Sequence, residues 1–136
     1  MPIDRQPRGS GDAFVKTILV VEDDADIGSF IVQAIHQETS HNALLVADGF
    51  QCLKAVHNLK PDLFIIDYQL PYMNGIELYD RLIDIENLKT RPTIMISAWL
   101  PAQEIQKRKI VGMKKPFELQ DLLNTIERQL TLGKVQ

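Results

Sequence analysis

The chain is poor in several features that mark common classes of protein. Cys52 is the only cysteine among 136 residues, so no internal disulfide can form, and this fits a reducing compartment. No stretch approaches the roughly 18 apolar residues that a membrane span needs. Residues 1–12 also lack the apolar run of a secretory signal. We therefore expect a cytoplasmic protein with no membrane segment.

Basic charge is also scarce. The 15 Lys and Arg residues face 18 Asp and Glu residues, and the formal net charge is −3, whereas general nucleic-acid binders carry a basic face. We therefore expect no direct contact with nucleic acid. His36, His41 and His57 lack the spacing of metal ligands. No glycine-rich phosphate loop is present, which argues against a nucleotide or flavin enzyme.

Apolar residues make up 45% of the chain, which suits one domain with a proper core. Short apolar runs bounded by turn signals predict buried strands, and patterns of helical spacing lie between them. Strands that alternate with helices predict a parallel sheet. The expected strands span residues 17–21, 43–46, 63–66, 93–96 and 110–113.

Four of the five expected helices show a clear apolar face. Asp24 precedes the first helix and is expected to be its N-cap rather than a metal ligand. The last helix is expected to start at Pro116, since proline is tolerated in a first turn. The expected inner faces are Ile27, Phe30, Ile31, Ala34 and Ile35, then Cys52, Leu53 and Val56, then Ile76, Tyr79, Leu82 and Ile83, and finally Leu119, Leu122, Leu123, Ile126 and Leu130.

The segment between residues 99 and 113 is open to two interpretations. In the first, a short and poorly anchored helix follows Pro101, with only Ile105 pointing inward, and a strand follows at 110–113. In the second, the helix continues to Gly112, which ends it, and the fifth strand nearly vanishes. We favour the first interpretation.

Polar side chains stand where four of the apolar runs end: Glu22 and Asp23, Asp67, Ser97, and Lys115. Ligands of parallel sheets bind at the carboxyl ends of the strands, so these groups should form one pocket. Three converging carboxylates repel one another unless a cation is present, and an all-oxygen site favours a hard ion such as Mg²⁺. An aspartate nucleophile beside a lysine suits phosphoryl transfer.

Four segments together resemble the receiver domain of bacterial two-component response regulators. They are residues 20–24, 67–75, 97–98 and 115–117, and the resemblance as a whole covers 16–131. It implies an α/β, flavodoxin-like (βα)5 fold, a three-layer sandwich around a parallel five-stranded sheet of order 2-1-3-4-5. The region of the fourth helix and fifth strand is expected to be shortened.

The resemblance also implies roles for the residues of the pocket. Asp67 would be the phosphoacceptor, and Ser97 and Lys115 would contact the phosphoryl group. The Mg²⁺ ligands would be Asp23, Glu22 through a water molecule, Asp67, and the main-chain carbonyl of Gln69.

The function implied is that of a response regulator receiver. It accepts a phosphoryl group from a sensor histidine kinase or a phosphotransfer protein and changes its surface for protein–protein signalling. It catalyses only its own phosphorylation and dephosphorylation, as a monomer or weak dimer, and the sequence does not name the downstream target. One alternative is a pseudo-receiver that binds a partner without phosphorylation, against which the intact acids, Ser97 and Lys115 argue. Another is a haloacid-dehalogenase-like phosphatase, whose second aspartate is replaced here by Gln69.

Several positions depart from the family pattern. The chain between Ser97 and Lys115 is about four residues shorter than usual, and Gly112 stands where the family has its switch aromatic. Asn74 stands where an acid is common, in a turn that asparagine also suits. The resemblance implies a cis peptide bond before Pro116.

The domain is expected to span residues 15–132, between a flexible N-terminal tail at 1–14 and a C-terminal tail at 133–136. The chain is either a stand-alone regulator or a segment of a longer one. Trp99, two residues after Ser97, is expected to overhang the mouth of the pocket.

Overall fold

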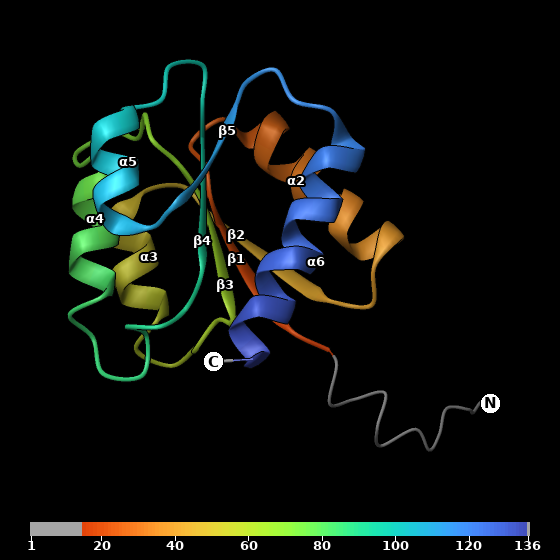
Figure 1. Cartoon of the computed structure of the whole chain (residues 1–136), viewed down its shortest axis with the longest axis horizontal. Coiled ribbons are helices and arrows are strands. Elements are labelled where there is room, and N and C mark those ends of the chain that lie inside the picture. The colour runs from red at the N-terminus through yellow and green to blue at the C-terminus, as the bar shows by residue number, and fades with distance from the viewer. Residues whose placement is uncertain (1–14, 136) are drawn as a thin grey trace.

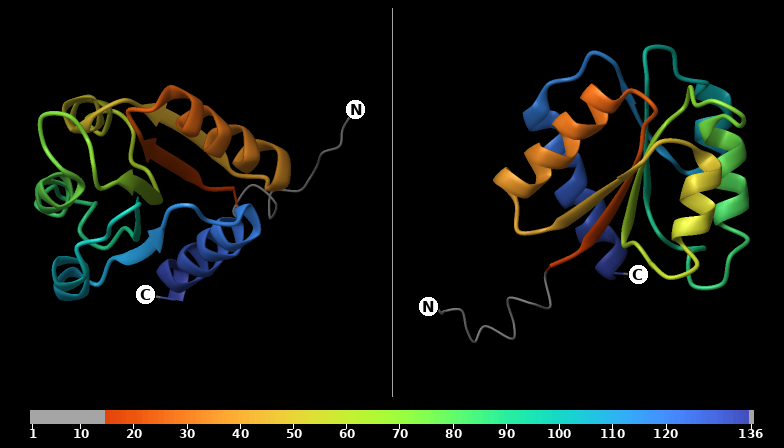
Figure 2. Two further views of the ribbon diagram at one scale, coloured as in Figure 1. Left: turned by 90° about the horizontal axis from the view of Figure 1, so that it is seen from above. Right: turned by 180° about the vertical axis from the view of Figure 1, so that it is seen from behind.

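A computed structural model describes residues 15–135, in which five parallel strands form one sheet of order β2-β1-β3-β4-β5. Helices α3, α4 and α5 cover one face of the sheet, and α2 and α6 cover the other (Figures 1 and 2). The predicted three-layer fold and strand order are confirmed. The elements are β1 Thr17–Val21, α2 Ala25–Glu38, β2 Asn42–Val46, α3 Gly49–Ala55, β3 Leu63–Asp67, α4 Gly75–Leu82, β4 Thr93–Ser97, α5 Ala102–Arg108, β5 Val111–Lys114 and α6 Leu119–Val135.

The core forms two clusters, one on each face of the sheet, because successive strand residues point to opposite faces. Leu19 and Phe64 pack under α3, α4 and α5, whereas Ile18 and Ile65 pack under α2 and α6. Strands β3 and β4 are buried along their whole length. A fully buried Leu or Ile side chain contributes about 1.5–3 kcal/mol, so these two central strands fix the fold around the site.

Helix α2 begins as predicted but presents a different face to the sheet. The Asp24 side chain accepts hydrogen bonds from the backbone N–H groups of Asp26 and Ile27, which confirms it as the N-cap. The prediction that Phe30 lies on the inner face is wrong, since its side chain is 52% exposed. Gly28 is buried instead, in tight contact with Leu45. Two sets of α2 residues have the spacing of a helix face that could pack on the sheet. The set that contains Gly28 does so, because the small glycine lets α2 approach β2 closely.

The ends of helix α6 also differ from the prediction. It begins at Leu119, three residues after the predicted start at Pro116, and its first turn closes with the bond from the Leu122 N–H to the Glu118 carbonyl. The Lys115–Pro116 peptide is cis, as predicted. The helix continues to Val135 through the stretch assigned to a C-terminal tail, because a glycine costs a helix only about 1 kcal/mol and does not end it alone. The tail predicted at 1–14 lies outside the described residues.

Helix α5 is short, and β5 is present as a strand, so the second interpretation of this segment is wrong. The helix ends at Lys109, whose left-handed backbone (φ 59°) stops it before Gly112. A Cβ on Gly112 would lie 3.2 Å from Leu100 Cδ1 and 3.3 Å from Ile105 Cδ1. These two side chains occupy the space beside the strand.

The expectation that α5 is poorly anchored needs correction, because ionic contacts replace the missing apolar ones. The Arg108 guanidinium donates to both carboxylate oxygens of Asp80 in α4, at 2.7 and 2.8 Å, and to Glu104 at 2.7 Å. The Tyr79 hydroxyl donates to the Arg108 carbonyl at 3.1 Å. A bidentate arginine–carboxylate pair is among the stronger polar contacts in proteins, so α5 is tied to α4 by charge.

Candidate functional site

The polar side chains at the strand ends meet at one edge of the sheet, as predicted. Strands β1, β3 and β4 are parallel and in register, so Glu22, Asp67 and Ser97 follow neighbouring buried residues at the same edge. Carboxylate oxygens of Glu22, Asp23 and Asp67 all lie within 4.8 Å of one another. Glu22 and Asp67 are buried, and Asp23 is exposed at the mouth.

Lys115 brings the positive charge of the site. Its Nζ donates to Asp67 Oδ2 at 2.9 Å and to Glu22 Oε1 at 3.2 Å. Its backbone N–H donates to the Ser97 carbonyl at 2.8 Å, which joins the β5–α6 connection to the end of β4. Burial alone would lower the pKa of Lys115, but the hydrogen bond to Asp67 and the charges of both acids raise it overall. The ammonium therefore stays charged between the two carboxylates.

Glu22 shows how crowded the acids are. Burial, together with the neighbouring Asp67 carboxylate, raises the pKa of Glu22 to about 7, although the Asp24 N–H bond and Lys115 act in the opposite direction. Desolvation and like charge both disfavour ionisation. An added cation would offset both effects, and three clustered carboxylates are the oxygen ligands that hard divalent ions prefer.

Asp67 is held by the backbone that follows it. Its Oδ1 accepts a hydrogen bond from the Gln69 N–H at 3.0 Å, and its side chain is almost fully buried. The Gly75 N–H donates to the Tyr68 carbonyl at 2.8 Å, which pins the start of α4 against the end of β3. Asn74 caps α4 in a reciprocal capping box with Glu77. The asparagine at this position therefore has a structural role.

Replacing Gly75 by alanine should destabilise the domain by about 1–3 kcal/mol. The new Cβ would lie 2.9 Å from the Asp67 carbonyl oxygen and 3.0 Å from Tyr68 Cα, backbone atoms that cannot easily move. Gly112→Ala is the matched control, because its Cβ would meet only the flexible ends of Leu100 and Ile105. Urea unfolding measures both free energies. Equal losses in the two variants would contradict the close approach of α4 to β3.

Ser97 ends β4, and Trp99 follows it in the next loop. Ser97 is fully buried, and its Oγ accepts a hydrogen bond from the Trp99 N–H at 3.2 Å. The Trp99 indole is 66% exposed and lies 6.4 Å from the Tyr68 ring, measured between centroids. Trp99 is thus linked both to Ser97 and to the residue that follows Asp67. The contacts of Ser97 with a phosphoryl group and of the Gln69 carbonyl with a metal stay predictions.

One feature beside the site was missed in the sequence. An apolar groove of about 570 Å³ runs from Lys115 along Pro116, Phe117, Ile27 and the exposed Phe30. The signal was present in the sequence, since Phe30 sits on the helical stripe. The spacing predicts a core position for Phe30, because exposed and buried positions of the helix share the same spacing.

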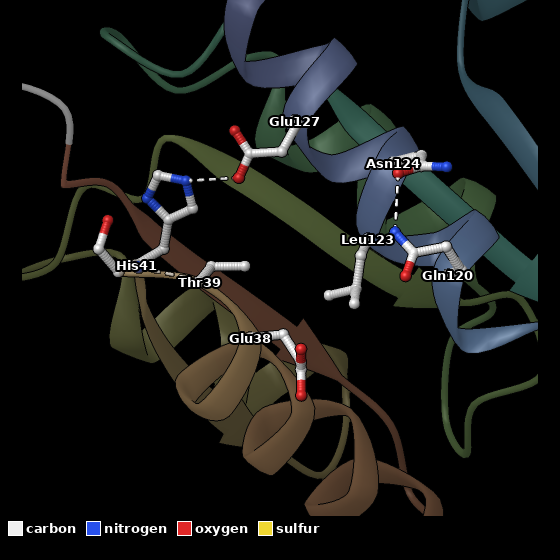
Figure 3. A pocket seen from close by; sticks show the side chains of 8 residues that line it. Glu38, Thr39, His41, Gln120, Leu123, Asn124 and Glu127 are labelled. Carbon is white, nitrogen blue, oxygen red and sulfur yellow. Dashed lines mark hydrogen bonds and ion pairs between the residues drawn. The ribbon is translucent and has the colours of Figure 1, made fainter.

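A second, polar cavity of about 320 Å³ lies between the end of α2 and helix α6 (Figure 3). His41 Nδ1 accepts a hydrogen bond from the Lys16 N–H at 3.0 Å, so the ring proton sits on Nε2, which donates to Glu127 at 3.0 Å. Both ring nitrogens are therefore engaged, and neither is available to a metal. His41 is a structural residue that ties the start of β1 to α6.

A comparison with known sequence families agrees with the fold and with the cluster of Glu22, Asp23, Asp67 and Lys115. Residues 18–127 match the model of the response regulator receiver domain, and the chain belongs to that family. Among the described residues, no helix has the length and apolar character to cross a membrane.

Two curated relatives illustrate the range of chains with this domain. Sporulation initiation phosphotransferase F of Bacillus subtilis is 29% identical over 120 residues, which are 85% of this chain and 94% of that protein. DNA-binding response regulator MtrA of Mycobacterium tuberculosis is 29% identical over 127 residues, which are 88% of this chain and 52% of that protein. This chain therefore spans about half the length of MtrA.

Solved structures agree on the fold. A CheY-like receiver domain protein from Methanospirillum hungatei superposes with a TM-score of 0.81 at 23% identity, over 88% of this chain and 97% of that one. Chemotaxis response regulator CheY4 of Vibrio cholerae gives 0.77 at 24% identity, over 84% and 98%.

Proposed function

We propose that the chain accepts a phosphoryl group on Asp67 and passes the signal on through a change of its surface. The donor is a sensor histidine kinase or a phosphotransfer protein, and the reaction requires Mg²⁺. The observation that carries the proposal is the buried Asp67 carboxylate held 2.9 Å from the Lys115 ammonium, with Glu22 and Asp23 beside it.

The residues fit the chemistry of an acyl phosphate. A carboxylate oxygen of Asp67 forms the new bond to phosphorus, while the bond from phosphorus to the donor nitrogen breaks and its electron pair stays with the donor. Bound Mg²⁺, held by Glu22, Asp23, Asp67 and the Gln69 carbonyl, would neutralise charge on the transferred group. A phosphoryl group adds about −1.5 to −2 charge, and Lys115 is the ammonium placed to pair with it.

The donor would dock on the apolar groove beside Lys115. Phe30 on α2 lines this groove together with Lys115, which contacts Asp67, so a partner seated there would present its phosphoryl group to the site. No separate observation favours the phosphorylation-independent pseudo-receiver, since every side chain of the acceptor pocket is present.

Incubation with acetyl phosphate and Mg²⁺ tests the proposal. Intact mass spectrometry should find one phosphoryl adduct on the chain, and excess chelator should prevent it, because the clustered acids repel the incoming anion unless a cation is present. The control contains the same chelator together with enough added Mg²⁺ to exceed it. Full labelling in chelator alone would refute the metal requirement, and no labelling under either condition would refute acceptor function.

Trp99 should report on ligands of the acceptor pocket. The backbone N–H of Trp99 donates a hydrogen bond to Ser97 Oγ, and its ring lies beside Tyr68. Binding of Mg²⁺ or a beryllofluoride mimic should therefore change the indole fluorescence. The indole should also slow hydrolysis of the acyl phosphate by excluding water. An unchanged spectrum with either ligand, together with an unchanged phosphoryl half-life in Trp99→Glu, would count against this placement.

A further inference from the structure

A basic cavity of about 420 Å³ lies at the amino-terminal end of β4, far along the strand from Ser97. The loop before β4, the end of α5 and the second half of α6 surround it. In Figure 1 this loop and the loop after β4 lie at opposite ends of the sheet. Four of its lining residues are cationic, Lys89, Arg91, Arg108 and Lys109, and no acidic side chain lines it.

Arg91 is the most unusual of these side chains. Its Nε is buried without a hydrogen-bond partner among the described residues, and its Nη1 lies 3.8 Å from Asp62 Oδ1, too far for a hydrogen bond. The other Asp62 oxygen already accepts from the Thr17 N–H at 2.9 Å. A buried donor left unpaired costs about 1–3 kcal/mol. Asp62 thus pairs with the guanidinium by charge alone, and no side-chain hydrogen bond to a described residue engages it.

The two lysines add charge that no acidic side chain lining the cavity cancels. Neither Lys89 nor Lys109 forms an ion pair with a described residue, whereas Arg108 is already matched by Asp80 and Glu104. Cations at the end of α5 would suit the helix dipole, which accounts for Arg108 and Lys109. It does not account for Lys89, which lies on a different loop of a chain whose net charge is −3.

We propose that this cavity binds a phosphate-bearing small molecule. Arg91 would offer its planar fork to the phosphate oxygens, Lys89 and Lys109 would supply the balancing charge, and the hydroxyl groups of Thr90 and Thr93 on the same wall can donate hydrogen bonds. Two free lysines and an arginine match a dianion better than a single carboxylate. The volume lies within the range of small-molecule sites and exceeds that of a lone phosphate ion.

Titration of the full chain with inorganic phosphate and with pyrophosphate tests the proposal. Amide shifts are followed by NMR at constant ionic strength, without Mg²⁺ and with Lys115→Ala as the background, so that the acceptor pocket does not contribute. Saturable shifts are expected at residues 89–93 and 108–111. Arg91→Gln should weaken binding about 10-fold or more, the loss of a charge-assisted contact, and Lys109→Gln should weaken it several-fold. Lys54→Gln, on α3, should leave it unchanged.

Three outcomes would overturn the proposal. They are shifts that chloride reproduces, shifts confined to residues around Asp67, and equal affinity in Arg91→Gln and Lys54→Gln. If Arg91→Gln fails to fold, the Lys109→Gln titration decides. The result is independent of acceptor function, because phosphorylation of Asp67 is measured separately on the chain with Lys115 intact.

Discussion

Asp67→Asn should abolish the phosphoryl adduct that forms with acetyl phosphate and Mg²⁺. The amide is nearly the same size as the carboxylate, and its oxygen can still accept the hydrogen bond from the Gln69 N–H. Lys115 keeps its contact with Glu22 at 3.2 Å, so the site should keep its shape. What disappears is the nucleophile, because a neutral amide oxygen does not attack phosphorus at a useful rate.

The matched control for this variant is Asp24→Asn. Asp24 lies one residue beyond the acidic cluster, its role is to cap α2, and asparagine caps a helix about as well as aspartate. This variant should label at the wild-type level, as measured by intact mass. An adduct that persists at full yield in Asp67→Asn would place the phosphoryl group on another residue, and peptide mapping would identify it.

The central strands and the cluster of polar residues at their ends could be predicted from the sequence for a physical reason. Strands covered by helices on both faces must be apolar on both faces, so they appear as continuous runs, and β3 and β4 were located to within one residue. A polar residue that ends such a run lies at the edge of the sheet. Asp67 and Ser97 followed from this rule.

Other features of the structure leave no local signal in the sequence. Arg108 and Asp80 are 28 residues apart, and nothing in the spacing of either one reveals that α4 and α5 bring them together. Phe30 and Gly28 belong to two competing helical stripes, and only the distance between α2 and Leu45 selects one. The Arg91 Nε, buried without a hydrogen-bond partner among the described residues, likewise becomes visible only when burial is known.

The ionic contacts of α5 change the expectation for how a signal would leave the site. Gly112 stands where the resemblance to receivers implies a switch aromatic, and Leu100 and Ile105 are packed beside it. Ser97 ends β4 and directly precedes the loop that carries Leu100, so a displacement of Ser97 would act on that packing. Residues 98–111 should therefore move as a body, and the contact between Arg108 and Asp80 is what resists the movement.

Arg108→Leu should lower the hydrogen-exchange protection of α5 about 10- to 100-fold, since charge-assisted hydrogen bonds contribute about 1.5–3 kcal/mol. Ile105 and the bond from the Tyr79 hydroxyl to the main-chain carbonyl of residue 108 would then hold the helix, while the amides of β3 should change much less. Lys107→Leu is the matched control, because its pair with Glu104 spans 3.8 Å between exposed side chains and contributes little. Equal protection in the two variants would contradict the anchoring role.

The pH dependence of the difference in α5 protection between wild type and Arg108→Leu shows whether the Arg108 ion pairs cause it. The hydrogen bond from Arg108 lowers the pKa of Asp80 below its ordinary value of 3.8, so ionised Asp80 favours the docked helix. A lowered pKa means that the contribution is complete above 3.8 and is lost as the pH falls through the lower folded value. Arg108 also lowers the pKa of Glu104 below its ordinary value of 4.5, so the protection gap between wild type and Arg108→Leu should stay constant around neutral pH and narrow only below about 4.5. Beryllofluoride added at neutral pH should reduce protection at 98–111 in the wild type and have a smaller effect in Arg108→Leu, where the contact that resists the movement is already gone. Strong protection that activation leaves unchanged would show that signalling does not pass through α5.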